Sequence, residues 1–256
     1  DITADNTSPG AASLTYTNGF VPSTSVSIGL ATGGDGAGSG VATWRLLRDT
    51  GVLSAGVCGT WSGYTTTVAS GSGTSSAPQS DTITDGGCFR YRIEVTDNVG
   101  NMGTYTALDV IKTDLTPPTG SLVLAPNAGP TQQYLQNPTT LFVNTNNTGS
   151  FDVNITAAAA SGVLDVAFPT IATGFSAGAT VPGPGTTYTR TYAWTAGASA
   201  PTPPQQATIR SNSLGSLNLP FDVIADSAGP TGASTTYANG FTSGSSVSVA
   251  YGAGTD

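Results

Sequence analysis

The stretch Phe89-Arg90-Tyr91-Arg92-Ile93-Glu94-Val95-Thr96 decides the fold class of this chain. Apolar and polar residues alternate along it with period two, which predicts a β-strand that is buried on one face only. The four apolar residues are expected to face a core, and the four polar residues, Glu94 among them, to face water. A turn is predicted at Asp97–Asn101, and residues 104–113 are predicted to return as the last strand of this unit.

The same alternation recurs on both sides of this stretch. Thirty-four Gly and sixteen Pro suit tight turns between short strands. About seven strands per unit, with turn signals roughly every ten residues, are typical of a β-sandwich. The predicted strands are 24–30, 41–48, 89–96 and 104–113 in the first unit, and 121–125, 140–144, 150–157, 162–168, 186–195, 207–212 and 217–225 in the second.

The last thirty-five residues repeat the first thirty-five without a gap. Asp5 aligns with Asp226 and Tyr16 with Tyr237 at a constant shift of 221 positions, and sixteen of the thirty-five pairs are identical. An ungapped internal match of this length indicates a tandem repeat. We therefore expect the chain to be a segment of a longer array whose repeat is 221 residues long.

A recurring motif divides this repeat into two units. Asp5, Asp114 and Asp226 each stand four residues before a Pro, and small residues and an extended apolar stretch follow. An Asp side chain closes a turn onto the backbone, and Pro stiffens a short linker. The motif therefore predicts junctions, with one domain at 1–114, a second at 115–225, and the first strands of a third at 226–256.

The composition argues against several classes of function. The chain has no His and one Glu, so the commonest general base is missing. Seven Lys and Arg against fifteen Asp and Glu give a net charge of −8, with no basic cluster for nucleic acid or anionic lipid. No apolar run approaches the ~18 residues of a membrane span. We expect no catalysis, no nucleic-acid partner and no membrane insertion in this segment.

A series of short motifs runs through the chain in a fixed order. They are Ser39-Gly40-Val41, Cys58-Gly-Thr-Trp61, Cys88-Phe-Arg-Tyr91, Thr96-Asp-Asn-Val-Gly-Asn101, Asp114-Leu-Thr-Pro-Pro118, Ser161-Gly162-Val163 and Tyr192-Ala-Trp194. In this order they resemble the tandem immunoglobulin-like repeats of very large bacterial surface and secreted proteins. The resemblance implies all-β, immunoglobulin-like sandwiches strung end to end in stalks, adhesins or fibres, with no catalytic residues to carry over.

Cys58 and Cys88 are the two cysteines of the chain, and both fall in the first unit. A disulfide between them is predicted to tie residues 50–80 to the strand at Phe89, and the chain-entropy model assigns it roughly 3–4 kcal/mol. Two buried free thiols are the alternative, whereas the spacing is not that of a redox motif. A disulfide implies an oxidising compartment, which agrees with an extracellular or cell-surface location.

Five carboxylates near the ends of the units are candidate ligands for Ca²⁺: Asp5, Asp97, Asp109, Asp114 and Asp226. A calcium site needs six to eight oxygen ligands that converge from several side chains and carbonyls. The alternative is that each Asp closes a local turn and keeps its charge in solvent, with no metal bound. No other cofactor is expected.

The aromatic residues raise the question of carbohydrate binding. Trp44 and Trp194 fall on alternating apolar positions and are predicted to lie in the core. Trp61 and Tyr64 lie in a Gly-rich segment and are the candidate residues for stacking on a surface glycan.

These patterns predict a structural function. We expect a non-catalytic segment of a large extracellular bacterial protein that forms a stalk, fibre or sheath and assembles with other copies, side by side or end to end. Two alternatives remain: an adhesin or carbohydrate-binding module, and a spacer in a secreted enzyme.

Overall fold

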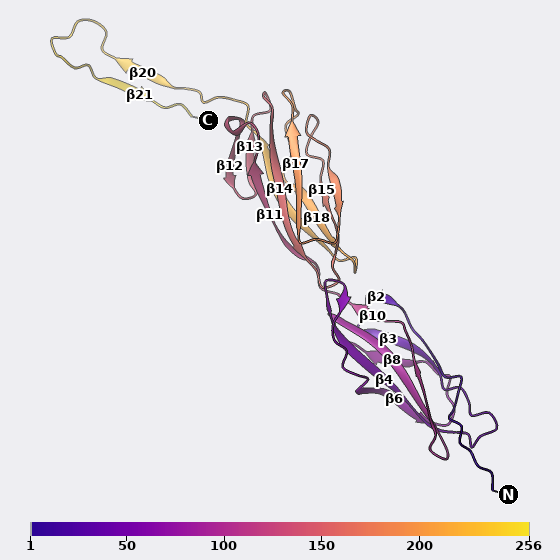
Figure 1. The fold of residues 1–256 in the computed structure, drawn as a ribbon. Helices are drawn as coiled ribbons and strands as arrows, with labels where there is room; N and C mark the ends of the chain where they lie inside the picture. The colour runs from indigo at the N-terminus through magenta and orange to yellow at the C-terminus, as the bar shows by residue number, and fades with distance from the viewer. Residues whose placement is uncertain (1, 256) are drawn as a thin grey trace.

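A computed structural model describes residues 2–255, and it consists almost wholly of β-strands (Figure 1). Asp1 and Asp256, which pair with Asp222 and Asp35 in the internal repeat, lie outside the described residues. One short 3₁₀ helix, η1 (Pro130–Gln132), interrupts the strands. Within residues 2–255, no helix has the length and apolar character that a bilayer crossing requires. The predicted all-β fold class is confirmed.

Residues 2–114, called here the first module, form two sheets that face one another. One sheet has the strand order β1-β3-β7, and the other β2-β10-β8-β4-β5, with β6 added to β4 and β9 added to β8. The strands are β1 (Ser13–Thr15), β2 (Gly19–Val21), β3 (Ser25–Ala31), β4 (Val41–Ser54), β5 (Val57–Cys58), β6 (Thr66–Ser72), β7 (Gln79–Thr82), β8 (Gly87–Asp97), β9 (Met102–Thr106) and β10 (Ile111–Thr113).

The core of the first module comes from the apolar positions of these alternating strands. Ile28 on β3 and Ile93 on β8 are completely buried, and Trp44 on β4 is 6% exposed, as predicted. The cluster consists of Leu14, Val26, Ile28, Leu30, Trp44, Leu46, Ile83, Phe89, Tyr91, Ile93, Val95, Ala107 and Ile111. Burial of this apolar surface is the main force that holds the two sheets together.

The predicted strand at 104–113 is broken in the structure. β9 pairs with the second half of β8, β10 pairs with its beginning, and residues 108–110 bulge away between them, after the Ala107 amide has bonded to the Tyr91 carbonyl. The hydroxyl of Tyr16 fills the gap: it accepts a hydrogen bond from the Tyr91 amide (3.2 Å) and donates one to the Asp109 carbonyl (2.7 Å). The prediction of one continuous strand was wrong here. The side chain of Tyr16, just after β1, bonds to the backbone groups of Tyr91 and Asp109 that would otherwise pair with each other across the sheet.

Glu94 also differs from its predicted environment. It lies on the outer face of the sheet, yet it is 7% exposed rather than open to water. Arg45 on the neighbouring β4 and Arg92 on its own strand reach its two carboxylate oxygens, at 2.6 and 2.8 Å. The two guanidinium groups cover the carboxylate. Ion pairs with one Arg of the neighbouring strand and one of its own strand therefore bury Glu94, which the alternation of polar and apolar residues assigns to solvent.

Residues 115–225, called here the second module, also form two sheets, but their strands differ in length from those of the first module. One sheet has the order β11-β14-β17, and the other β12-β13-β19-β18-β15-β16. The strands are β11 (Thr119–Pro126), β12 (Gln133–Asn137), β13 (Thr140–Val143), β14 (Gly149–Ala158), β15 (Val163–Phe168), β16 (Ala179–Pro182), β17 (Thr187–Trp194), β18 (Gln205–Ser211) and β19 (Ser216–Ala225).

The second module has a separate core that is richer in aromatic residues. Phe151 stacks on Tyr192 with ring centroids 5.6 Å apart, and Phe175 stacks on Trp194 at 6.0 Å. Trp194 is 2% exposed, as predicted for a core position. The two clusters of buried apolar residues share no member, and they fall on either side of the predicted boundary at 114/115.

Residues 226–255 form a two-stranded hairpin of β20 (Ser234–Tyr237) and β21 (Val249–Gly252). Ser234 pairs with Gly252 as Ser13 pairs with Ala31, and the outer bridge Thr231–Thr255 matches Gly10–Gly34. Each of these pairs differs from its counterpart by the shift of 221. The two copies found in the sequence therefore have the same strand register.

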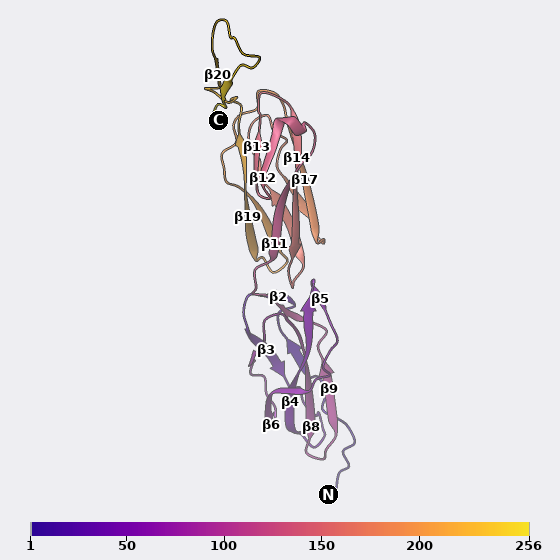
Figure 2. The same ribbon diagram turned by 90° about the vertical axis from the view of Figure 1, so that its left-hand side faces the viewer.

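The modules lie end to end rather than side by side (Figures 1 and 2). The N-terminal segment is at the far end of the first module, and the hairpin of β20 and β21 projects from the far end of the second. The two modules meet where the β4–β5 turn approaches the loop between β14 and β15.

Candidate functional site

The junction between the two modules is held by the carboxylate of Asp114. This residue is 5% exposed, and its Oδ2 accepts hydrogen bonds from the Ser161 amide (2.8 Å) and the Ser213 hydroxyl (3.3 Å). Both partners lie in loops of the second module, 47 and 99 residues further along the chain. The sequence predicted a local turn at Asp114; instead its side chain reaches forward and ties the linker to the module that follows.

A second carboxylate ties the same linker back to the first module. Asp85, in the turn before β8, accepts hydrogen bonds from the Leu115 amide (2.7 Å) and the Thr116 hydroxyl (2.9 Å). The Leu115 amide is the largest cause that lowers the pKa of Asp85 below its ordinary value. Residues 114–116 are therefore bonded on both sides, which restricts the rotation of one module against the other.

The modules also touch directly. The amide of Gly56, in the β4–β5 turn, donates to the Ala160 carbonyl at 2.9 Å. Gly56 has a φ of +80°, and a side chain on it would come within 2.8 Å of the Ser161 carbonyl oxygen. Both the left-handed backbone and the close approach require glycine at this position.

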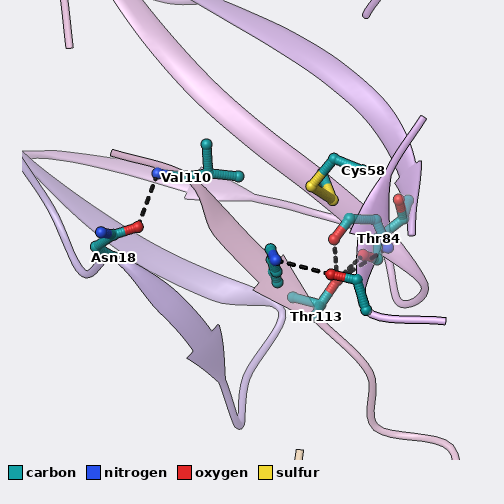
Figure 3. The surroundings of a disulfide bond; sticks show 9 residues. Asn18, Cys58, Thr84, Val110 and Thr113 are labelled. Carbon is teal, nitrogen blue, oxygen red and sulfur yellow. Dashed lines mark hydrogen bonds between the residues drawn. A yellow bond between two sulfur atoms is a disulfide. The ribbon is translucent and has the colours of Figure 1, made fainter. Parts of the chain in front are cut away.

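The predicted disulfide between Cys58 and Cys88 is present (Figure 3). Cys58 follows the Gly56 turn by two residues, and Cys88 follows Asp85 by three. The bond therefore joins the two segments of the first module that contact the linker and the second module. Because it crosslinks both supports of the junction, it holds them at a fixed separation.

Thr113 strengthens the same region from the end of β10 (Figure 3). It is completely buried; its hydroxyl donates to the Thr84 carbonyl (2.6 Å) and accepts from the Gly87 amide (3.2 Å). The last strand of the first module is thus fastened to the β7–β8 turn one residue before Asp114.

Trp61 and Tyr64, the candidate glycan-binding residues, lie in a loop that is anchored to the outer face of the second sheet. The guanidinium of Arg90 lies 4.2 Å from the Trp61 ring centroid and 5.3 Å from that of Tyr64, and Arg92 lies 4.6 Å from Tyr64. Such cation–π contacts hold an aromatic ring in place but also occupy a face on which a sugar would stack. Both residues are half-buried.

The loop is fixed by a buried carboxylate beneath it. Asp49 is 0% exposed and accepts two hydrogen bonds from Arg90, at 3.0 and 2.7 Å. The Ser62 hydroxyl (3.0 Å) and the Gly63 amide (2.7 Å) bind its other oxygen. Burial raises the pKa of Asp49, but Arg90 and the loop donors outweigh it, so the pKa lies below its ordinary value.

Three carboxylates gather at the opposite end of the first module. Asp5 in the N-terminal segment, Asp35 in the β3–β4 loop and Asp97 at the end of β8 each place one oxygen within 4.8 Å of the other two. Asp97 is 2% exposed. Oδ1 of Asp35 is buried and has no hydrogen-bond donor among residues 2–255. Carboxylate oxygens are the ligands that Ca²⁺ prefers, so this cluster is a candidate cation site.

Backbone donors already stabilise the charge of this cluster. The pKa of Asp5 is well below its ordinary value, above all because the Ser39 amide donates to it at 2.6 Å. Burial raises the pKa of Asp97. Hydrogen bonds from Asn101, Val99 and Gly100 lower the pKa by more than burial raises it, so the net shift is downward. Asp5 and Asp97 also close the local turns that the sequence predicted, through Thr7 and Val99.

The structure brings together two of the five predicted calcium ligands. Asp109 lies in the bulge between β9 and β10, Asp114 lies at the junction, and Asp226 begins the segment of the C-terminal hairpin; none belongs to the cluster. Asp35 was missed by the prediction. The internal repeat carried a signal for it, since Asp35 is among the residues that are identical between the two copies.

Comparison with known proteins gives no assignment. No protein-family model matches the chain, and no curated protein matches it. Trypsin-activated α2-macroglobulin from Escherichia coli matches with 12% identity and a TM-score of 0.31, over 92% of this chain and 19% of that one. Salmonella α2-macroglobulin reacted with methylamine matches with 11% identity and a TM-score of 0.27, over 90% of this chain and 17% of that one. The chain spans about a fifth of their length, and similarities this low transfer no activity or partner.

Proposed function

We propose that this chain is a non-catalytic structural segment of a large extracellular protein. Its immunoglobulin-like modules, joined end to end, would form a stiff stalk or fibre that assembles with other copies. The observation that carries the proposal is the junction: Asp85 and Asp114 hold the linker on both sides, and Gly56 binds Ala160 across the interface. A flexible spacer would have no need of these bonds.

The disulfide supports the same proposal in two ways. It connects the Gly56 turn to the Asp85 segment, so the surface that faces the second module is crosslinked. A disulfide also persists only in an oxidising compartment, which favours an extracellular location. The net charge of −8 supports solubility of an exposed rod.

The proposal predicts the dimensions of the molecule. Strands of about ten residues, which rise roughly 3.3 Å per residue, are about 33 Å long, so with its end turns each module adds about 35–40 Å and the pair about 70–80 Å. Small-angle X-ray scattering of the chain in solution would test this. We expect a maximum dimension that reflects two collinear modules plus the hairpin, with the narrow cross-section of a rigid rod. A distribution of bent and compact shapes would contradict a stiff stalk.

The glycan-binding alternative receives little support from its two candidate residues. Arg90 lies against Trp61 and Tyr64, and Asp49 orders the loop that carries them, so the aromatic rings serve the packing of the loop. A glycan array with the intact chain is the direct test, and binding that Trp61→Ala abolishes would revive the alternative. The spacer of a secreted enzyme remains a second alternative, which a catalytic domain elsewhere in the same polypeptide would favour.

A further inference from the structure

The strands that begin and end each module determine how the chain transmits tension. The long strands run roughly along the line that joins the two ends of the molecule (Figures 1 and 2). The chain enters the first module through β1 and leaves it through β10, and it enters the second through β11 and leaves it through β19. A pull on the two ends therefore acts along these strands and slides them past their neighbours.

Such sliding strains a whole ladder of hydrogen bonds at once. The bonds of an antiparallel ladder are perpendicular to the strands, and those of a parallel ladder are slanted but evenly spaced. Because a pull along the strand strains all of these bonds together, they share the load, and the strand slides only when they break together. The length of the ladder that holds a terminal strand therefore sets the tension at which its module yields.

The terminal strands of the first module are held by short ladders. β10 is three residues long; it pairs with β2 in parallel along its length and with β8 at Ile111 and Lys112. β1 is also three residues long and pairs with β3. The hydroxyls of Tyr16 and Thr113 add single bonds beside these ladders. Both ends of the module therefore depend on few bonds.

The terminal strands of the second module are held by long ladders. β11 is eight residues long and pairs with β14 along its whole length. β19 is ten residues long, and it pairs with β18 over Ser216–Phe221 and with β13 over Asp222–Ala225. A pull along either strand has to break many more bonds together than a pull along β10. The first module should therefore yield at lower tension than the second.

The junction keeps this order. Asp85 ties the linker to the first module through bonds from Leu115 and Thr116, and both bonds are exposed to solvent. Asp114 ties the linker to the second module through a buried bond from Ser161. A hydrogen bond in the low dielectric of the interior is stronger than one in water. The linker therefore stays with the second module when tension separates the two, and the pull reaches β10 directly.

The disulfide limits how far the first module extends once it has yielded. Cys58 and Cys88 are separated by 30 residues, and their Cα atoms lie 5.9 Å apart. The tension passes through the bond, so the residues between the two cysteines are not stretched. At roughly 3.3–3.6 Å per extended residue, the bond withholds about 100 Å of length. It joins β5 to β8 and crosslinks neither β1 nor β10, so the short ladders still set the tension at which the module yields.

We propose that the chain carries tension along its axis and that the first module is its extensible element. It yields before the second module and lengthens by an amount that the Cys58–Cys88 bond limits, while the linker and the second module stay folded. This deepens the stalk or fibre proposed above and rests on that proposal for its biological use. A rod built in this way absorbs a sudden pull without losing all of its folded structure.

Single-molecule force spectroscopy tests the order in which the modules yield. The unaltered chain is held by handles at its two ends and stretched at constant speed. The two-stranded hairpin of β20 and β21 is too small to resist a load and extends first. Without a disulfide, residues 10–113 and 119–225 would give two steps of similar length. We expect the step at lower force to be about 100 Å shorter than the step at higher force.

A dithiol reductant identifies the withheld residues. After the first step, dithiothreitol is added to a chain held at constant force, and it reduces the Cys58–Cys88 bond to two thiols while it forms its own cyclic disulfide. The chain should then lengthen by a further step of about 100 Å. In the variant with Cys58→Ser and Cys88→Ser, this further step should disappear and the first step should be longer by the same amount.

A proline substitution in β2 weakens the ladder of β10. The amide of Gly19 donates to the Val110 carbonyl, just before β10, at 2.8 Å. Amides two residues apart on a strand face the same neighbour, so the Val21 amide also faces β10. Val21→Pro removes this donor. We expect it to lower the force of the first step and to leave the second step unchanged.

A matched substitution in β11 weakens a ladder of the second module. The Leu124 amide donates to the Pro138 carbonyl, on the side away from β14, so the Val123 amide faces β14. The side chain of Val123 is 46% exposed, so Val123→Pro removes a donor of this ladder and leaves the core intact. We expect it to lower the force of the second step alone, which makes each proline variant the control for the other.

Three results would overturn the order of yielding: a longer step at the lower force, a first step that Val123→Pro weakens, or one step in which both modules extend together. A chain that dithiothreitol does not lengthen would overturn the limit set by the disulfide. If Val21→Pro abolishes the calorimetric transition of the first module, the step lengths of the unaltered chain still decide. A flexible junction in scattering would contradict the stiff stalk but not this order, so the two proposals fail separately.

Discussion

The carboxylate of Asp114 accepts a hydrogen bond of 2.8 Å from the backbone amide of Ser161, across the boundary between the two modules. Asp114 and Ser161 are 5% and 0% exposed, so neither group can be satisfied by bulk water. A buried polar group that loses its partner costs about 1–3 kcal/mol. This bond therefore makes the orientation of the modules part of the folded structure.

The first prediction concerns this bond. Asp114→Ala should loosen the junction, because the Ser161 amide then loses its acceptor and the linker is held from one side only. Scattering should show a broader distribution of shapes, and NMR relaxation should show that the modules tumble more independently. Asp109→Ala is the matched control, since Asp109 makes no intermodule contact among the described residues. Unchanged tumbling in the Asp114 variant would contradict the role assigned to this residue.

The second prediction concerns the disulfide. Replacement of Cys58 and Cys88 by Ser should lower the free energy of unfolding of the first module by roughly 3–4 kcal/mol, the chain-entropy value for a loop of this size. The second module has its own core, so its unfolding transition should remain. Differential scanning calorimetry resolves the two transitions. A loss of stability shared equally by both modules would mean that they unfold as one unit.

The third prediction concerns calcium at the cluster of Asp5, Asp35 and Asp97. A bound cation would give the Asp35 Oδ1 atom the partner that residues 2–255 do not offer it. Calcium at ten times its dissociation constant would stabilise the first module by about 1.4 kcal/mol. We expect the melting temperature to rise with Ca²⁺ and the rise to disappear in Asp35→Asn. A melting temperature that neither calcium nor chelation changes would remove the site.

The fourth prediction concerns acid. The pKa values of Asp5, Asp49, Asp85 and Asp97 are all lowered in the folded chain, so the folded state binds fewer protons than the unfolded chain. Their contribution to stability is complete above the unfolded pKa of about 4 and is lost as the pH falls through the folded values. Chemical denaturation of the first module between pH 7 and 2.5 should show this loss. Asp97→Asn should reduce the slope, and an unchanged slope would argue against a role for Asp97.

The fifth prediction concerns the ion pair beneath the Trp61 loop. Arg90→Met leaves the fully buried Asp49 without its cation. Because Arg90 is itself 33% exposed and Ser62 and Gly63 still donate to Asp49, the loss of stability should lie below the roughly 3–5 kcal/mol of a fully buried pair. The double variant with Asp49→Asn should recover part of this loss, because the uncompensated charge is gone. Urea unfolding of the single and double variants gives the coupling energy. Additive effects would show that the two side chains do not act as a pair.

Much of this protein could be predicted from residue patterns along the chain. The period of two in residues 89–96 predicted the all-β class, and the same alternation in the strands that carry Trp44 and Trp194 placed both residues in cores. The shift of 221 predicted a copied segment, and the copies share one strand register. Two cysteines in one unit predicted their own bond. These features follow from the spacing of residues within a strand, from a comparison of two stretches of sequence, or from a count of cysteines. The amino-acid sequence is therefore sufficient to predict them.

Other features are decided only when the sheets pack. The strand predicted at 104–113 is split because the hydroxyl of Tyr16, the residue after β1, bonds to the backbone groups of Tyr91 and Asp109. Glu94 is buried because Arg45 approaches from β4. Asp35 joins Asp5 and Asp97 because a loop and the end of a strand converge on the N-terminal segment, and Asp114 finds Ser161 across 47 residues. The sequence by itself determined periodicity, repetition and local turns; the tertiary structure decided which distant side chain satisfies each buried polar group, because that choice exists only after the chain has folded.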